Sequence, residues 1–272
     1  MCRMQANPQP LLDPGRAASK DGPDVIAAHC SSADIRTTPS HRHARGQAIG
    51  ALHGLLSIDT PTGRIVVPPS HAVWIPPEQL HGLRSHGPFS GWSVYVSPAH
   101  CAQLPSESVV TRVSNLLREA VLRAASWSAV DSIDQAQSHV SAVILDELAL
   151  LPQERFTLPL PREPRLLKIA VALADHPADQ RDLQQWAQWA GIAPRTLTRR
   201  FAAETGMSLS AWRQRARLMR ALEWLAADKP VTAIAIDLGY DSLSAFIAMF
   251  KKALGASPTQ YMADAMSPLT RS

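Results

Sequence analysis

Residues 183–208 read LQQWAQWAGIAPRTLTRRFAAETGMS, and residues 231–257 read VTAIAIDLGYDSLSAFIAMFKKALGAS. The two stretches are copies of one unit. Ala187 and Gly191 in the first copy recur as Ala235 and Gly239 in the second. Beyond the turn the spacing grows by one residue, and Leu197, Phe201, Gly206, Ser208 and Trp212 recur as Phe246, Phe250, Gly255, Ser257 and Tyr261. Such an internal repeat decides the architecture of the region that contains it.

Each copy has the pattern of a helix-turn-helix. Gly191 or Gly239 follows a short helix and permits a left-handed turn at low cost. The next helix is expected to start at Pro194 in the first copy and at Asp241 or Ser242 in the second, because these residues suit the first turn or the N-cap. The apolar face of this helix packs inward, which leaves the opposite face available for a DNA major groove.

Length and charge suit a two-domain protein that binds nucleic acid. The chain has 272 residues, a hydrophobic content of 46% and a formal net charge of +4. Residues 1–161 contain 12 Lys or Arg against 13 Asp or Glu, whereas residues 162–272 contain 15 against 10. Charge alone fits an ordinary solvated surface better. Its coincidence with the repeat favours a surface that binds phosphate.

Several other protein classes are disfavoured. Cys2, Cys30 and Cys101 form no C-x-x-C pair, so neither a disulfide framework nor a zinc finger is expected, and a reducing cytoplasm is the natural compartment. No apolar run is long enough to span a membrane. No nucleophile pattern of the Ser/His/Asp or Cys/His type and no Gly-rich phosphate loop is apparent, so no catalytic residue is assigned.

The N-terminal part predicts a small β-rich domain. Residues 1–24 are expected to form a disordered leader. In residues 25–104, apolar and polar residues alternate in short runs that Pro and Gly interrupt, which indicates a β-barrel or sandwich. The complete chain is therefore predicted to be α+β, with this domain followed by a helical hairpin and an all-α C-terminal domain.

Residues 105–151 predict two amphipathic helices in an antiparallel hairpin. The apolar positions are Val109, Val113, Leu116, Leu117, Ala120, Val121 and Ala124 in the first helix, and Val140, Ile144, Leu148 and Leu151 in the second. After a break at residues 126–132, Asp131 or Ser132 can cap the second helix. The hairpin fits packing against the barrel and dimerisation equally well.

Residues 152–164 are rich in Pro and predict a semi-rigid linker to a helical domain at residues 165–265. Between the two copies of the repeat, residues 208–227 predict a helix about 30 Å long. Successive major grooves lie about 34 Å apart, so this helix can hold two recognition helices in adjacent grooves. Its arginines are expected to contact phosphate or to brace the two halves: Arg213, Arg215, Arg217 and Arg220.

Histidines form a candidate ligand site in the β-rich domain. His41 and His43 are two residues apart just before a predicted strand, so both can face the barrel interior if they are extended, and His81 follows a Pro-rich turn. This resembles the motifs of cupins, but Gln47 occupies the position nearest to the cupin carboxylate, which argues against a catalytic iron or manganese site. The three histidines can hold Zn²⁺ or Ni²⁺, or can serve without a metal. A pocket for a small effector is predicted from His41, His43, Gln47, Trp74, His81 and Trp92, although each aromatic residue taken singly fits a filler of the barrel better.

The order of barrel, hairpin, linker and doubled helix-turn-helix resembles the AraC/XylS family of transcriptional regulators. The most specific match runs from Gly239-Tyr240-Asp241-Ser242 through Phe250-Lys251-Lys252 to Ser257-Pro258 and Tyr261. The resemblance covers residues 165–262 most strongly. It implies a C-terminal domain that binds double-stranded DNA and an N-terminal domain for an unidentified small effector or for homodimerisation, with RNA polymerase as a further partner.

Carried over by position, the resemblance assigns a DNA-contacting set on each recognition helix. The first helix offers Arg195, Thr196, Thr198, Arg199 and Arg200. The second helix offers Ser242, Leu243, Ser244, Ala245, Ala248, Lys251 and Lys252. Arginine can form two hydrogen bonds to guanine, whereas small side chains offer only hydroxyl and methyl contacts. We therefore expect the first helix to carry most of the sequence selectivity.

Two other functions fit parts of the sequence. A cupin metalloenzyme fused to a DNA-binding module would need an open metal position, and Gln47 in place of a carboxylate counts against it. A non-specific DNA-organising protein would not need two different recognition helices, and the modest net charge also disfavours it.

Overall fold

The chain divides into two units, which the computed structural model describes over residues 12–127, 133–150, 153–154 and 156–266. The N-terminal unit comprises Met1–Thr60 and Ile65–Phe156, and the C-terminal unit comprises Pro61–Arg64 and Thr157–Ser272. The boundary between Phe156 and Thr157 falls inside the predicted linker at residues 152–164. This segment is not entirely a linker, because its described residues include the short strands β8 (Gln153–Glu154) and β9 (Thr157–Pro159).

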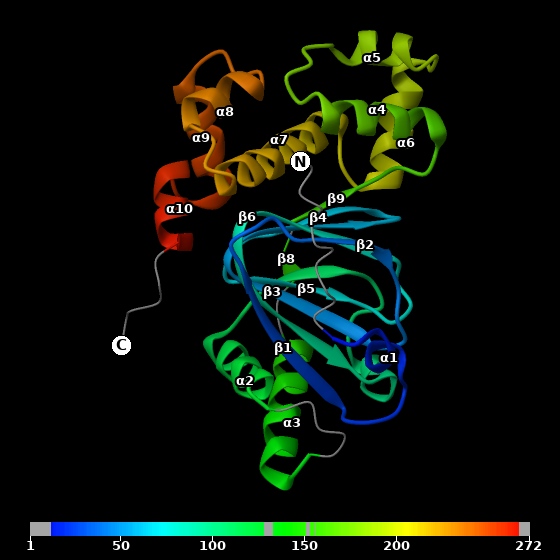
Figure 1. Ribbon diagram of the computed structural model, residues 1–272. Helices are drawn as coiled ribbons and strands as arrows, with labels where there is room; N and C mark the ends of the chain where they lie inside the picture. Colours follow the sequence, from blue (N-terminus) through cyan, green and yellow to red (C-terminus); the bar gives the residue numbers. More distant parts are fainter. Residues whose placement is uncertain (1–11, 128–132, 151–152, 155, 267–272) are drawn as a thin grey trace, which may run out of the picture. The chain divides into compact units, whose positions relative to one another are not determined.

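The N-terminal unit is built on a large sheet (Figure 1). Its two longest strands, β3 (Gly46–Thr60) and β6 (His81–Val96), form an antiparallel pair. The other strands are β1 (Val25–Ser32), β2 (Thr37–His41), β4 (Gly63–Val67), β5 (His71–Ile75) and β7 (Val109–Arg112). The order is β1-β6-β3-β5-β7-β8, with β2 also paired to β6 and β4 to β3 and β9. A short 3-10 helix, η1 (Pro98–Gln103), follows β6.

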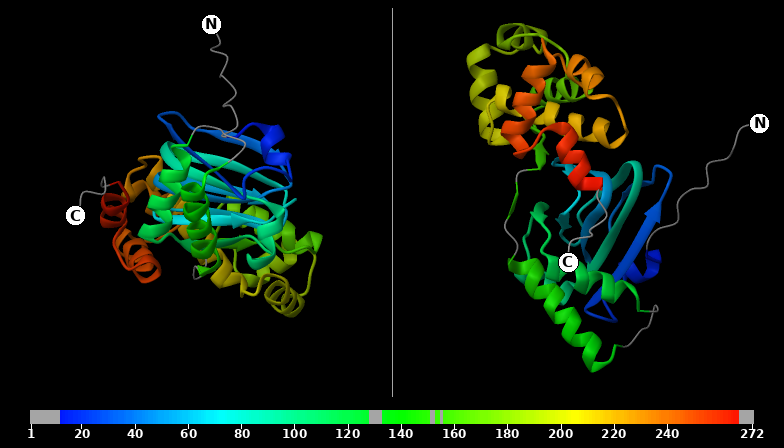
Figure 2. Two further views of the ribbon diagram at one scale, coloured as in Figure 1. Left: turned by 90° about the horizontal axis from the view of Figure 1, so that it is seen from below. Right: turned by 90° about the vertical axis from the view of Figure 1, so that its left-hand side faces the viewer.

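Strand alternation sends side chains of neighbouring residues into two different cores. One core lies between strands and contains Ile49, Ile58 and Ile75. The other lies where the sheet meets helices, and it contains Trp74 and Trp92 together with residues of α2 (Asn115–Ala125) and α3 (Gln135–Leu150). Figure 2 shows these two helices side by side against the sheet.

The predicted hairpin is present but begins later than expected. Val109–Arg112 form strand β7, which pairs with β5, instead of the first turn of a helix. The run Val109-Val110-Thr111 is β-branched and therefore favours a strand when a partner is available. Leu116 is 56% exposed, so this apolar position of the predicted helix does not pack against the sheet. The caps predicted at Asp131 or Ser132 and the apolar position Leu151 lie outside the described residues.

The expectation of a disordered leader over residues 1–24 is wrong for its described part, residues 12–24. Pro14–Ala18 form helix α1, which Asp13 caps through its carboxylate. Leu12 and Ala17 are buried beside Tyr95. The fully buried Arg45 guanidinium donates hydrogen bonds to the carbonyl oxygens of three further residues of this segment, Ser19, Asp21 and Pro23.

The C-terminal unit is helical apart from β9 and the short segment of β4 that it includes. Its helices are α4 (Pro164–Asp175), α5 (Leu183–Trp189), α6 (Pro194–Thr205), α7 (Leu209–Ala226), α8 (Val231–Asp237), α9 (Leu243–Leu254) and α10 (Pro258–Met266). Gly191 and Gly239 follow α5 and α8 with φ of 64° and 75°, as the helix-turn-helix pattern requires. The α+β fold class is thus confirmed. In the described part of the chain, no helix combines the length and the apolar character that crossing a membrane requires.

Candidate DNA-binding surface and histidine site

The recognition helices α6 and α9 are held by equivalent aromatic contacts. Leu197 and Phe201 of α6 are fully buried, and Phe201 meets Trp212 of α7 edge to face with ring centres 5.9 Å apart. At the equivalent positions of the second copy, Phe250 of α9 meets Tyr261 of α10 at 5.7 Å. The repeat therefore reproduces the packing as well as the helix order, and each recognition helix has a fixed inward face.

The outward face of α6 carries the predicted arginines. Arg195, Arg199 and Arg200 are exposed, and so is Thr198. The Thr198 hydroxyl donates to the carbonyl of Pro194 at 3.1 Å, while Thr196 is half-buried. Side chains four residues apart share a helix face. Arg195 and Arg199 thus form one exposed pair on α6.

The outward face of α9 is small and mostly apolar. Ser242 is the N-cap, and its hydroxyl accepts a hydrogen bond from the amide of Ala245 at 3.1 Å. Leu243 is 39% exposed. The other predicted contacts on this helix are also exposed: Ser244, Ala245, Ala248, Lys251 and Lys252. Only the two lysines, in the last turn, supply positive charge.

The arginines of α7 brace the C-terminal unit. Arg217 is buried and donates from Nε to the carbonyl of Pro177 at 2.9 Å. Arg220 pairs with the buried Glu223 at 2.9 Å and also donates to the Ala174 carbonyl. Arg213 donates to the Asp179 carbonyl, and Arg215 donates to the Thr157 carbonyl at 3.3 Å. Of the two roles predicted for this set, these contacts favour bracing over contact with phosphate.

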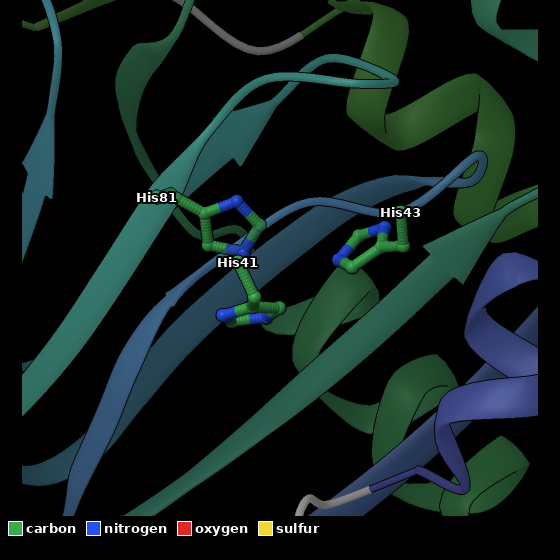
Figure 3. A group of neighbouring side chains, drawn as sticks. All are labelled: His41, His43 and His81. Carbon is green, nitrogen blue, oxygen red and sulfur yellow. The ribbon is translucent and has the colours of Figure 1, made fainter.

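In the N-terminal unit, the three predicted histidines come together (Figure 3). His41 ends β2 and lies directly across from His81, the first residue of β6. His43 lies in the connection to β3. Possible ligand atoms of the three rings all lie within 4.8 Å of one another. His43 and His81 are buried and His41 is half-buried, so the cluster is open towards solvent at His41.

Backbone carbonyls fix the orientation of each imidazole. The Nδ1 atoms of His41, His43 and His81 lie 2.9, 2.7 and 2.8 Å from the carbonyl oxygens of Pro39, Arg45 and Gln79. A carbonyl can only accept, so each Nδ1 carries a proton, and Nε2 of a ring has a free lone pair when that ring is neutral. Burial lowers the pKa of His43, and burial with the nearby His41 and His43 lowers the pKa of His81 to about 4. Neutral rings with one nitrogen held by a carbonyl are the form that binds metal ions.

Gln47 on β3 links two of the rings. Its carboxamide oxygen lies 3.1 Å from Nε2 of both His43 and His81, and its nitrogen donates to Ser93 Oγ at 3.1 Å. Tyr95 adds an edge contact to His43 with ring centres 5.4 Å apart, and burial raises its pKa to about 12. The sequence pattern places Tyr95 in a strand beside the histidines but does not indicate Ser93. The alternation of both residues on a strand opposite Gln47 is the signal that points to them.

The six residues predicted to line one effector pocket do not share one. Gln47 lies opposite Ile75 and Tyr95, whereas its neighbour Ala48 lies opposite Trp74 and Val94. Trp74 and Trp92 therefore belong to the core against α2 and α3, on the other side of the sheet from the histidines. Trp74 lines a cavity of about 60 Å³ there. Only His41, His43, Gln47 and His81 remain together.

Comparisons with known proteins cover both units. One family model, an AraC-like ligand binding domain, matches residues 23–152, and another, a helix-turn-helix domain, matches residues 186–264. The HTH-type transcriptional regulator NimR of Escherichia coli (strain K12) is 33% identical over 242 residues, which are 88% of each chain. The arabinose operon regulatory protein of the same strain is 29% identical over 124 residues, 44% of this chain and 42% of that protein. The solved DNA-binding domain of AdpA, in complex with a target DNA, is 30% identical and covers 36% of this chain and 88% of that chain, with a TM-score of 0.34.

Proposed function

Because the chain belongs to the AraC family of DNA-binding transcriptional regulators, we propose that it selects its target sites mainly through α6 and holds the DNA backbone through α9. In this family the helix-turn-helix domain binds DNA and the N-terminal domain binds a small-molecule effector. The single observation that carries the proposal is the contrast between the two outward faces. The face of α6 carries three exposed arginines, and that of α9 carries small side chains followed by two lysines.

Arginine is the side chain best suited to reading guanine, since two of its N–H groups match O6 and N7 in the major groove. Arg195 and Arg199 lie on one face of α6, so both can enter the same groove. The α9 residues Leu243 and Ala248 can contact only thymine methyl groups, and Lys251 and Lys252 suit phosphate.

We expect Arg199→Ala to reduce discrimination between the target site and altered sites by about 1–3 kcal/mol, because it removes one base-reading side chain. Fluorescence anisotropy titrations with the mapped target and with single-base variants measure this discrimination. Arg84→Ala is the matched control, since it removes an exposed positive charge from the N-terminal unit. Ala248→Gly on α9 is expected to change discrimination less. An equal loss in Arg199→Ala and Ala248→Gly would refute the division of roles.

The proposal extends to a divalent metal ion, Zn²⁺ or Ni²⁺, held by His41, His43 and His81. Three facts support the fit: burial lowers the pKa of His43 and His81, a backbone carbonyl holds Nδ1 of each ring, and possible ligand atoms of all three lie within 4.8 Å of one another. Purified protein is expected to take up about one such ion per chain, and His43→Gln, which removes a ligand, is expected to lose it. Unchanged uptake in His43→Gln would contradict the assignment.

The remaining proposals concern the oligomeric state of the protein, its compartment and its partners. The hairpin leaves Leu116 and Leu150 56% and 79% exposed, which supports a homodimer through α2 and α3. We expect Leu150→Glu to shift the protein towards the monomer in analytical ultracentrifugation, and an unchanged dimer would place the interface elsewhere.

The proposed regulator acts in the cytoplasm on double-stranded DNA, together with RNA polymerase, and is not an enzyme. Turnover of a small molecule by the metal-loaded protein would contradict the last point.

A further inference from the structure

The neutral side chain of Gln47 determines the charge of the histidine site. The clustered ligand atoms come from three imidazoles, and no carboxylate of the described residues belongs to the cluster. Glu78 influences His43 through its charge, but it is exposed and outside the cluster. A dication bound by this set therefore keeps both of its positive charges.

Gln47 also suits the site both with and without an ion. In the structure its oxygen lies 3.1 Å from Nε2 of both His43 and His81, and its nitrogen donates to Ser93. Without an ion, a half-turn of the amide would turn the NH₂ group towards the rings, where it can donate one hydrogen to each Nε2, and the Ser93 hydroxyl can then donate to the oxygen. A carboxylate at this position cannot donate in this way and would cancel one positive charge.

From this geometry we infer that the metal-loaded histidine site is a receptor for a small anion, with Gln47 as the residue that sets this specificity. Three imidazole ligands leave one position of a four-coordinate ion, which an exogenous anion can take in place of the neutral Gln47 oxygen. In a buried site, an uncompensated positive charge attracts an anion far more strongly than it would in water. His41 is the half-buried member of the cluster, so the anion enters at its side.

This inference rests on the proposed metal site and specifies its effector as an anionic group, such as the carboxylate of a small molecule. Little space surrounds His43, Gln47 and His81, which are 8%, 4% and 1% exposed. The group that reaches the site must therefore be small, while the rest of an effector can extend outwards past His41.

Cobalt(II) titration of the full chain, followed by azide, tests the inference. The visible absorption of bound Co²⁺ reports its ligand set, and azide is a small anion that changes this spectrum when it binds. We expect one Co²⁺ per chain and a saturable spectral change with azide. Gln47→Glu is expected to keep Co²⁺ but to weaken azide binding about tenfold or more, because it adds a negative charge beside the ion.

Two variants separate charge from other effects. Gln47→Met removes the carboxamide without adding a charge, so a loss of azide binding equal to that in Gln47→Glu would assign the effect to the lost carboxamide and overturn the role of charge. Gln103→Glu adds the same charge at an exposed position of η1 and is expected to have no effect. Circular dichroism confirms that each variant folds.

The possible outcomes separate the anion receptor from the metal site and from the proposed role of α6 in DNA recognition. Bound Co²⁺ without a saturable response to azide, or equal azide affinity in wild type and Gln47→Glu, would overturn the anion receptor and leave the metal site standing. Failure to bind Co²⁺ would remove the metal site and the receptor together. DNA binding by the same preparation, measured separately, shows whether the proposed selection of sites by α6 survives either result.

Discussion

At the scale of single residues, His81 couples the histidine site to the stability of the N-terminal unit. Its side chain is 1% exposed, and burial is the main reason that its pKa falls to about 4, with the neighbouring His41 and His43 acting in the same direction. The unfolded chain restores a pKa of about 6.5. Below pH 6.5 the unfolded state therefore binds a proton that the folded state does not, and stability falls until the pH approaches 4.

We expect His81→Asn to make the pH dependence of unfolding shallower by up to about 1.4 kcal/mol per pH unit between pH 6 and 4.5. Asparagine can retain the hydrogen bond to the Gln79 carbonyl but does not titrate. Urea unfolding of the metal-free protein in the presence of a chelator measures the slope. His29→Asn, which replaces an exposed histidine, is the control. A slope identical to that of the wild type would show that His81 does not contribute.

At the scale of elements, short-range signals account for most of what the sequence predicts well. The turn glycines, Pro194 and Ser242 act within a few residues of where they stand, so α6 and α9 begin at Pro194 and Leu243, where the pattern places them. Strand β7 is different. Val109–Arg112 have a helical spacing of apolar residues but pair with β5, a partner about 38 residues earlier that no local pattern identifies.

Ser242 offers a direct test of local capping on α9. Its hydroxyl accepts from the Ala245 amide, so Ser242→Ala is expected to reduce the free energy of unfolding of the C-terminal unit by about 1 kcal/mol. Ser244→Ala is the matched control. It lies two residues on, exposed inside the helix, where alanine is the better helix former and no loss is expected. Denaturant titration measures the free energy of unfolding of both variants. Equal values for Ser242→Ala and Ser244→Ala would mean that the cap contributes nothing.

At the scale of the whole molecule, the uneven charge predicts how DNA binding responds to salt. Residues 162–272 carry the positive excess, and Lys251 and Lys252 are the exposed cations of α9. We expect the double variant Lys251→Gln/Lys252→Gln to reduce the slope of log affinity against log salt by up to about 2, since each phosphate contact releases counterions. The preference among sites is expected to persist, because phosphate contacts carry no sequence information.

Titrations of matched and mismatched DNA at several salt concentrations measure both quantities. Arg84→Ala again serves as the control for charge on the N-terminal unit. A variant that loses site preference while keeping its salt slope would assign the lysines to base contacts and would contradict the proposed role of α9.

Contacts of the candidate site between residues far apart in the chain cannot all be predicted from the sequence. Spacing favours a cluster of His41, His43 and His81, because the first two are two residues apart and the third follows a turn. The expected strand does not extend to His43, which lies in the connection between β2 and β3. Trp74 and Trp92 cannot be assigned in this way. Whether they face the histidines or the helices depends on strand register, and the pairing of Ala48, not Gln47, with Trp74 decides it. Arg45 holds the segment Ser19–Pro23 through backbone carbonyls, which leave no sequence signature.

The separate inward face of each recognition helix has a consequence for how this protein can diversify. Helix α6 is held by the contact of Phe201 with Trp212, and α9 by the contact of Phe250 with Tyr261. The outward side chains of the two helices take no part in these contacts. Exposed substitutions away from caps and cores usually change stability by less than about 0.5 kcal/mol. The outward positions of α6 can therefore be exchanged as a set while the scaffold persists. Substitutions at these positions, whether selected or engineered, can therefore give new operator specificities without passing through variants that fail to fold.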